Sequence, residues 1–212
     1  MRAVSFGTYD GPLRAAIHAL KYDRVHPAAQ RLGAMLASAI AQLALEAPAE
    51  LLVVPVPLHR SKRRQRGFNQ ARALARYAIL ELHKTHPAWR LKLAPAALMR
   101  LRSTESQAGL TPHQRRVNVR GAFNVSNRSA VKDRHILLVD DILTTGATAR
   151  AAAQSLIRAG AASVYVATLA RARRIHFNQA QSFADRAQPG IEPAAVQPLA
   201  SMHSPSSTHQ PF

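Results

Sequence analysis

The chain has 212 residues, 47% of them hydrophobic, so it can bury a sizeable core as one domain. It has no cysteine, which excludes a disulfide scaffold and a cysteine-ligated metal. Its net charge of +18 exceeds what one small anionic ligand needs and favours non-specific, salt-dependent binding of nucleic acid. A generally basic proteome would explain the charge equally well, and the few aromatic residues, 5% of the total, form no interleaved platform for stacking bases.

Two helices are predicted ahead of the first strand. Apolar residues at helical spacing predict a short amphipathic helix over residues 13–20, and a second helix opens near Pro27 and continues through residues 32–45. Residues 32–45 form an uncharged, mainly apolar stretch that is shorter than the ~20 residues that span a bilayer, so no membrane insertion is expected. The start, MRAVSFGTYDG, lacks the apolar core of a secretory signal, and a cytoplasmic location is expected.

The first strand is predicted at residues 51–56 (LLVVPV), and its prolines indicate that it soon becomes a loop. This loop, residues 57–69, carries five basic residues and no acid: Arg60, Lys62, Arg63, Arg64 and Arg66. Loops that follow neighbouring parallel strands meet at one edge of the sheet, so we expect the cluster to bind pyrophosphate there, with Arg60, Arg64 and Arg66 as the candidates. A solvated face or a nucleic-acid patch is the alternative. The next helix is predicted at residues 71–82.

Residues 102–118 (RSTESQAGLTPHQRRVN) form a polar, aperiodic segment between possible strands at residues 96–101 and 121–125. An irregular segment of this length is either disordered or a lid over a site. As a lid it would close its arginines over a polyphosphate and orient the ligand with its other polar residues. The candidates are Arg102, Arg115 and Arg116, with Thr104, Gln107 and Asn118. A flexible surface loop or a charged helix is nearly as consistent with the composition.

Residues 136–148 (ILLVDDILTTGAT) are the most informative part of the sequence for function. The apolar run 136–139 is typical of a central parallel strand, and Asp140 and Asp141 follow at its carboxyl end, where ligands of open α/β sheets collect. Adjacent carboxylates are costly to desolvate, and a ribose diol with Mg²⁺ would satisfy them. The threonines and Gly146 of residues 144–148 supply hydroxyls and amide donors at a helix start, which suits an anion. A plain helix cap is the alternative, but it needs only one polar residue.

The rest of the pattern predicts an α/β fold. A helix after Thr148 and a strand at residues 164–169 (VYVATL) complete a βαβ unit, which indicates a central, mainly parallel sheet flanked by helices. We expect one domain over residues 1–171. Residues 172–212, rich in Gln, Ser, Pro and Ala without periodicity, are predicted to form a disordered tail.

Residues 136–148 resemble the phosphoribosyl-pyrophosphate (PRPP) signature of type I phosphoribosyltransferases. This resemblance implies that Asp140 and Asp141 hold the ribose hydroxyls, and that the next turn cradles the 5′-phosphate through Thr144, Thr145, Gly146, Ala147 and Thr148. Four stretches are similar, in this order, to the ComF (competence protein F) family, over about residues 9–171. They are YDGPLRAAIHALKYDR, PVPLHRSKRRQRGFNQA, RSTESQAGLTPHQRRVNVRGAF and ILLVDDILTTGATAR.

The resemblance implies that residues 102–118 form a flexible loop that closes on PRPP, with Arg102 and Gln107 joining the acid pair in catalysis. Mg²⁺ is implied as the partner of PRPP, held through it near Asp140 and Asp141 rather than by a set of protein ligands. Many ComF members carry an amino-terminal zinc-binding segment with paired cysteines. This chain has no cysteine, so either that segment was lost or this sequence starts downstream of it, and no zinc is expected in these residues.

Three hypotheses follow. The chain transfers phosphoribosyl from Mg²⁺-PRPP to an unidentified nitrogen acceptor, or it binds PRPP or a nucleotide without turnover as an accessory factor. In the third, the site is vestigial and the basic surface alone binds nucleic acid. The ComF family is associated with DNA uptake in natural transformation, so the resemblance suggests single-stranded DNA and a competence helicase as partners.

Overall fold

The computed structural model describes residues 1–22, 26–102, 114, 119 and 121–172. Most of the segment predicted to form a lid, and the predicted tail from residue 173 onward, lie outside the described residues. Within the described ranges, no helix is long and apolar enough to cross a membrane.

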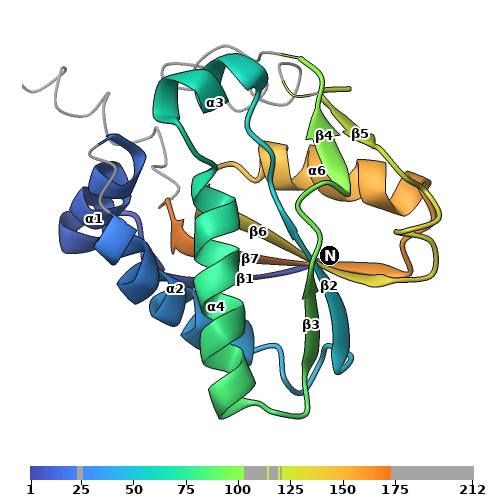
Figure 1. The fold of residues 1–212 in the computed structure, drawn as a ribbon, viewed down its shortest axis with the longest axis horizontal. Helices are drawn as coiled ribbons and strands as arrows, with labels where there is room; N and C mark the ends of the chain where they lie inside the picture. The colour runs from blue at the N-terminus through green and yellow to red at the C-terminus, as the bar shows by residue number, and fades with distance from the viewer. Residues whose placement is uncertain (23–25, 103–113, 115–118, 120, 173–212) are drawn as a thin grey trace, which may run out of the picture. The chain divides into compact units, whose positions relative to one another are not determined.

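A parallel sheet of five strands forms the centre of the molecule (Figure 1). Its order is β1-β7-β6-β2-β3, and each neighbouring pair runs parallel. This confirms the predicted α/β fold with a central parallel sheet flanked by helices. The strands are β1 (Arg2–Thr8), β2 (Glu50–Pro55), β3 (Arg90–Leu93), β6 (His135–Leu143) and β7 (Ser163–Arg171).

Helices cover both faces of this sheet. One face packs against α1 (Gly11–Tyr22), α2 (His26–Ala41) and α4 (Gln70–Thr85). The other packs against α6 (Ala147–Arg158) and a small antiparallel pair, β4 (Leu98–Arg100) and β5 (Phe123–Val125). Because β6 lies inside the sheet and both of its faces are covered, its residues 136–139 are all apolar and fully buried.

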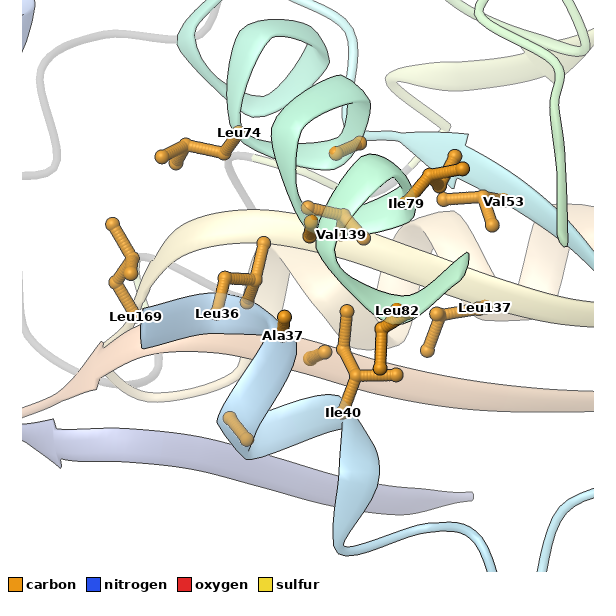
Figure 2. Close-up of a cluster of buried hydrophobic side chains, with 14 of the residues drawn as sticks. Leu36, Ala37, Ile40, Val53, Leu74, Ile79, Leu82, Leu137, Val139 and Leu169 are labelled. Carbon is orange, nitrogen blue, oxygen red and sulfur yellow. The ribbon is translucent and has the colours of Figure 1, made fainter. Parts of the chain in front are cut away.

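The larger core lies between α2, α4 and the sheet. Figure 2 shows leucine, isoleucine and alanine side chains of the two helices directed at apolar side chains of the strands. The helices approach closely at Gly33, where an added Cβ would lie 2.3 Å from the Cβ of Tyr77. A side chain at residue 33 would therefore force α2 and α4 apart.

The expectation that two helices precede the first strand is wrong, because β1 comes before both. Among the described residues this strand pairs with β7 alone, and it buries only Val4, so its apolar signal is weak. The sequence reading also missed β3, another edge strand, which has four residues and a short alternation of Leu91 and Leu93 with charged residues. Both strands depend on a neighbour that sequence periodicity does not reveal.

Candidate functional site

The candidate site lies at the carboxyl end of the sheet, where β2 ends and β6 extends beyond it. The β2–β6 register ends at Pro55 opposite Val139, and the amide of Val56 still donates to the carbonyl of Val139 at 2.8 Å. On its other side β6 pairs with β7 as far as Leu143. The predicted strand, residues 136–139, was therefore too short. Asp140 and Asp141 lie on the extension of β6, where β2 no longer flanks it.

A cavity of about 220 Å³ opens beside this extension. The end of α1, the segment from β2 to the start of α4, the end of β4 and the turn from β6 into α6 all contribute to its wall. Its charged lining residues, among those described, are Lys21, Lys62, Arg66, Arg100, Asp140 and Asp141. Four cations thus face two carboxylates, so the cavity favours a ligand with several negative charges.

The two carboxylates have different surroundings. Asp141 Oδ2 lies 2.6 Å from the Nζ of Lys21, in the last turn of α1, and both side chains are only 15% exposed. Asp140 Oδ1 accepts a hydrogen bond of 2.9 Å from the amide of Asp141. Burial, followed by the charge of Asp141, raises the pKa of Asp140 to about 8, although that amide and Lys21 oppose the rise. In the ligand-free protein, Asp141 has a cationic partner and Asp140 tends to retain a proton.

We expect Asp140→Asn to stabilise the ligand-free protein at alkaline pH. Because folding raises this pKa above its usual 3.8, the folded state holds a proton that the unfolded chain has lost. Stability therefore falls as pH rises through this range, and the cost is complete above about pH 8. Calorimetry in metal-free buffer should show a melting temperature above wild type at pH 8.5, with about 2–4 °C for each kcal/mol regained. The difference should shrink at pH 5, and an equal difference at both values would contradict the explanation.

The turn after β6 presents a helix N-terminus to the cavity. Gly146 is the N-cap of α6 and has a φ of 74°, a conformation that glycine adopts without strain. The Oγ1 of Thr145 accepts from the amide of Ala147 at 3.4 Å. The structure places Thr144, Gly146, Ala147 and Thr148 in the cavity wall, whereas Thr145 is not among the lining residues. The first amides of a helix lack intrahelical acceptors, so this turn can bind an anion.

The basic segment contains a helix, where the sequence predicted only a loop. This helix, α3 (Arg60–Arg66), begins after His59, whose Nδ1 accepts from the amide of Ser61 at 3.3 Å. It ends at Gly67, which has a φ of 80° and donates its amide to the carbonyl of Arg63 at 2.9 Å. The expectation failed because α3 buries no residue and therefore has no apolar periodicity.

The basic residues of α3 lie on two different faces of the helix. Lys62 and Arg66, one turn apart, are partly buried and line the cavity. Arg60 and Arg64, also one turn apart, are exposed and do not line the cavity. The same is true of Arg63. Of the three arginines predicted to bind pyrophosphate, the structure thus brings Arg66 to the cavity and leaves Arg60 and Arg64 outside it.

Positive charge is crowded at the inner face of α3. Burial, and then the charges of Arg100, Arg66 and Lys21, lower the pKa of the Lys62 amine. Burial also lowers the pKa of Arg100, which Asp140 partly offsets. The guanidinium of Arg100 stacks 5.4 Å from the ring centroid of Phe123 in β5. A polyanion would relieve this crowding, and in its absence the positive groups repel one another.

The lid residues are only partly placed. Arg102 is exposed and does not line the cavity. The two strands expected on either side of the lid are present as β4 and β5, paired so that Arg100 lies opposite Phe123. The remaining lid candidates, Thr104, Gln107, Arg115, Arg116 and Asn118, lie outside the described residues.

Comparison with known proteins gives matches over most of the chain. Residues 30–182 match the family model of the phosphoribosyl transferase domain. The chain is 33% identical over 172 residues to the DNA utilization protein YhgH of Escherichia coli, covering 80% of this chain and 72% of that protein. It is 28% identical over 174 residues to competence protein F of Haemophilus influenzae, covering 81% and 73%. Competence protein ComFC of Bacillus subtilis is 36% identical over 121 residues, covering 57% and 44%.

Proposed function

Because this chain belongs to the phosphoribosyl transferase domain family, as one of its ComF-like members, we propose that its cavity binds Mg²⁺-PRPP and transfers phosphoribosyl to a nitrogen acceptor. The observation that carries the proposal is the position of the acid pair. Asp140 and Asp141 lie in one cavity with the anion-binding turn of α6 and with the inward cations of α3. A sugar that is phosphorylated at both ends matches this order of groups.

Each part of the cavity has a distinct role in this proposal. The turn at residues 144–148 binds the 5′-phosphate, and the carboxylates of Asp140 and Asp141 accept hydrogen bonds from the ribose hydroxyls. Lys62 and Arg66 bind the pyrophosphate. As the bond from C1 to the pyrophosphate oxygen breaks, its electron pair leaves with pyrophosphate, and the acceptor nitrogen forms the new bond to C1 and releases its proton to solvent. The carboxylates stabilise the positive charge that develops on the ribose.

The donor set fits Mg²⁺ when the ion arrives with its ligand. Carboxylate oxygens are suitable Mg²⁺ ligands, but the described residues contain no group of three or more His, Asp or Glu that could hold a metal ion. Phosphate oxygens of PRPP would therefore supply most of the coordination. When bound, Mg²⁺ neutralises charge on the departing pyrophosphate.

Calorimetric titration of the full chain with PRPP, with and without Mg²⁺, tests this function. We expect saturable binding that strengthens with Mg²⁺. Release of pyrophosphate on addition of amines or nucleobases would then establish transfer. Absence of PRPP binding by a protein that melts cooperatively would contradict the proposal.

Two observations favour a second function, a PRPP- or nucleotide-binding accessory factor that also binds DNA. The relatives include proteins named for DNA utilization and for competence. Beside the cavity, the outer face of α3 exposes Arg60, Arg63 and Arg64. In this alternative the same cavity binds its ligand without turnover, and the outer face of α3 binds DNA phosphates.

Replacing Arg63 and Arg64 by Ala is expected to reduce the salt dependence of DNA binding. Each lost phosphate contact lowers the slope of log affinity against log salt by about 0.7 for single strands. Fluorescence anisotropy with a labelled oligonucleotide at several salt concentrations measures this slope. The exposed pair Arg72 and Arg76 of α4, changed to Ala, provides the control for lost charge. Equal changes in both variants would show that DNA binding is not localised on α3.

A further inference from the structure

Gln70, the first residue of α4, is a polar side chain in this cavity whose hydrogen bonding is incomplete among the described residues. It is 2% exposed, and its Oε1 accepts a hydrogen bond of 3.3 Å from the Nη1 of Arg66. Within the part of the chain that the structure describes, its Nε2 has no partner. A buried donor without an acceptor costs free energy. It therefore indicates that a bound ligand supplies the acceptor.

The surroundings of Gln70 define the chemistry of that group. Gln70 lines the cavity together with its neighbours Asn69 and Ala71, at the N-terminus of a helix of 16 residues. Asn69 caps this helix, its side-chain oxygen accepting from the amide of Arg72 at 3.2 Å. Lys62 and Arg66 of α3 line the same side. Because Nε2 is itself a donor, its partner must be an acceptor. The ammonium of Lys62, the guanidinium of Arg66 and the helix amides are donors too, and their positive charge favours an anion.

The cavity has a second anion-binding end, and the two ends differ. The N-terminus of α6 offers the turn around Gly146 with threonine hydroxyls, which suits a single phosphate. The α4 end adds Lys62, Arg66 and the amide of Gln70 to its helix terminus. More donors and two more positive charges match a group with more oxygens and more negative charge, namely a diphosphate.

We propose that Gln70 is a specificity-determining residue for the diphosphate of the ligand: Nε2 donates to a diphosphate oxygen while Oε1 holds Arg66 in position to bind the same group. This inference rests on the proposed function and deepens it. Gln70 distinguishes ribose that carries a diphosphate from ribose that carries only a 5-phosphate. The neutral amide can bind the anion and orient the guanidinium at once, whereas a carboxylate could do only the second.

The test compares three ligands on variants of the full chain by calorimetry: inorganic pyrophosphate, PRPP and ribose 5-phosphate. Gln70→Met keeps the approximate size but removes the amide. It is expected to lose about 10–100-fold in affinity for pyrophosphate and PRPP, because a donor to a charged acceptor is lost. Affinity for ribose 5-phosphate should remain within about twofold. Gln65→Met, an exposed glutamine of α3, is the matched control and should behave as wild type.

Gln70→Glu provides a second variant that retains the shape of the side chain. Its carboxylate can hold Arg66 but repels the anion, so its loss of pyrophosphate affinity should exceed that of Gln70→Met. The melting temperature adds a separate readout. Gln70→Met should melt no lower than wild type in the absence of ligand, since it removes a donor that has no acceptor among the residues that the structure describes.

Several results would overturn the inference. Unchanged pyrophosphate affinity in both variants would mean that Nε2 binds only water. An equal loss for ribose 5-phosphate, or a large fall in melting temperature for both variants, would mean that Gln70 supports the fold. Failure of the proposed function looks different, because wild type itself would then bind neither PRPP nor pyrophosphate, and the inference would fall with it.

Discussion

Changing Asp140 and Asp141 together to Asn should lower the affinity for Mg²⁺-PRPP by at least ~100-fold. Each carboxylate that accepts a hydrogen bond from a ribose hydroxyl contributes about 1.5–3 kcal/mol, and two such bonds are lost. The neutral amide at residue 141 also leaves Lys21, whose Nζ lies 2.6 Å from Asp141 Oδ2, without its counter-charge. Calorimetric titration of wild type and variant in parallel measures the loss.

The control is an acid outside the cavity. Asp133 is exposed and has a φ of 56°, a conformation that asparagine tolerates well, so Asp133→Asn should bind PRPP as wild type does. DNA affinity of the double variant should stay unchanged or rise slightly, since negative charge is removed. Loss of DNA binding together with intact PRPP binding would overturn the assignment of the site.

The second large effect concerns the two faces of α3. Replacing Lys62 and Arg66 by Met should weaken binding of inorganic pyrophosphate by at least ~100-fold, because two charged donors to the anion disappear. Folding should tolerate the change. Burial and neighbouring cations already lower the pKa of Lys62, so its charged form is disfavoured in the folded state. A titration with pyrophosphate and a thermal melt together separate binding from stability.

The same helix supplies a matched control. Arg60 and Arg64 have the same spacing as Lys62 and Arg66 but are exposed and do not line the cavity. Replacing these two by Met removes the same net charge, and we expect a loss of less than threefold, of the size that long-range attraction alone provides. If the outward pair caused the larger loss, the pyrophosphate site would have to lie on the outer face of α3.

The sequence predicted the parts of the fold that bury a clear apolar pattern. The run 136–139, the helix from residue 147 and the strand β7 have patterns that burial enforces, and they are present. The failures share a physical reason. The strands β1 and β3 lie at sheet edges, and α3 is fixed by caps at His59 and Gly67 rather than by an apolar face.

The candidate site was predictable only where it is local in the chain. Residues 140–148 are continuous and carry their own pattern. Lys21 and Arg100 reach the cavity from α1 and β4, distant in sequence, and no spacing relates them to the acid pair. The sequence does not show which cations of residues 60–66 face the cavity. Their orientation follows from helical spacing, and no pattern in the sequence indicates that this segment is a helix. In the sequence Gln70 is an ordinary first residue of a helix, and what distinguishes it is its burial and an Nε2 that has no partner among the described residues.

The contact between Lys21 and Asp141 changes how affinity at this site has to be understood. Asp141 Oδ2 is already engaged by an ammonium group before any sugar arrives. A ribose hydroxyl that binds this oxygen must displace the ammonium or share the oxygen with it. On the proposed function, displacement of Lys21 would make ligand entry an exchange of partners rather than a simple addition, and a measured dissociation constant would reflect the difference between the new contacts and the old one. The intrinsic strength of the sugar contact is greater than titration of the wild-type chain will show.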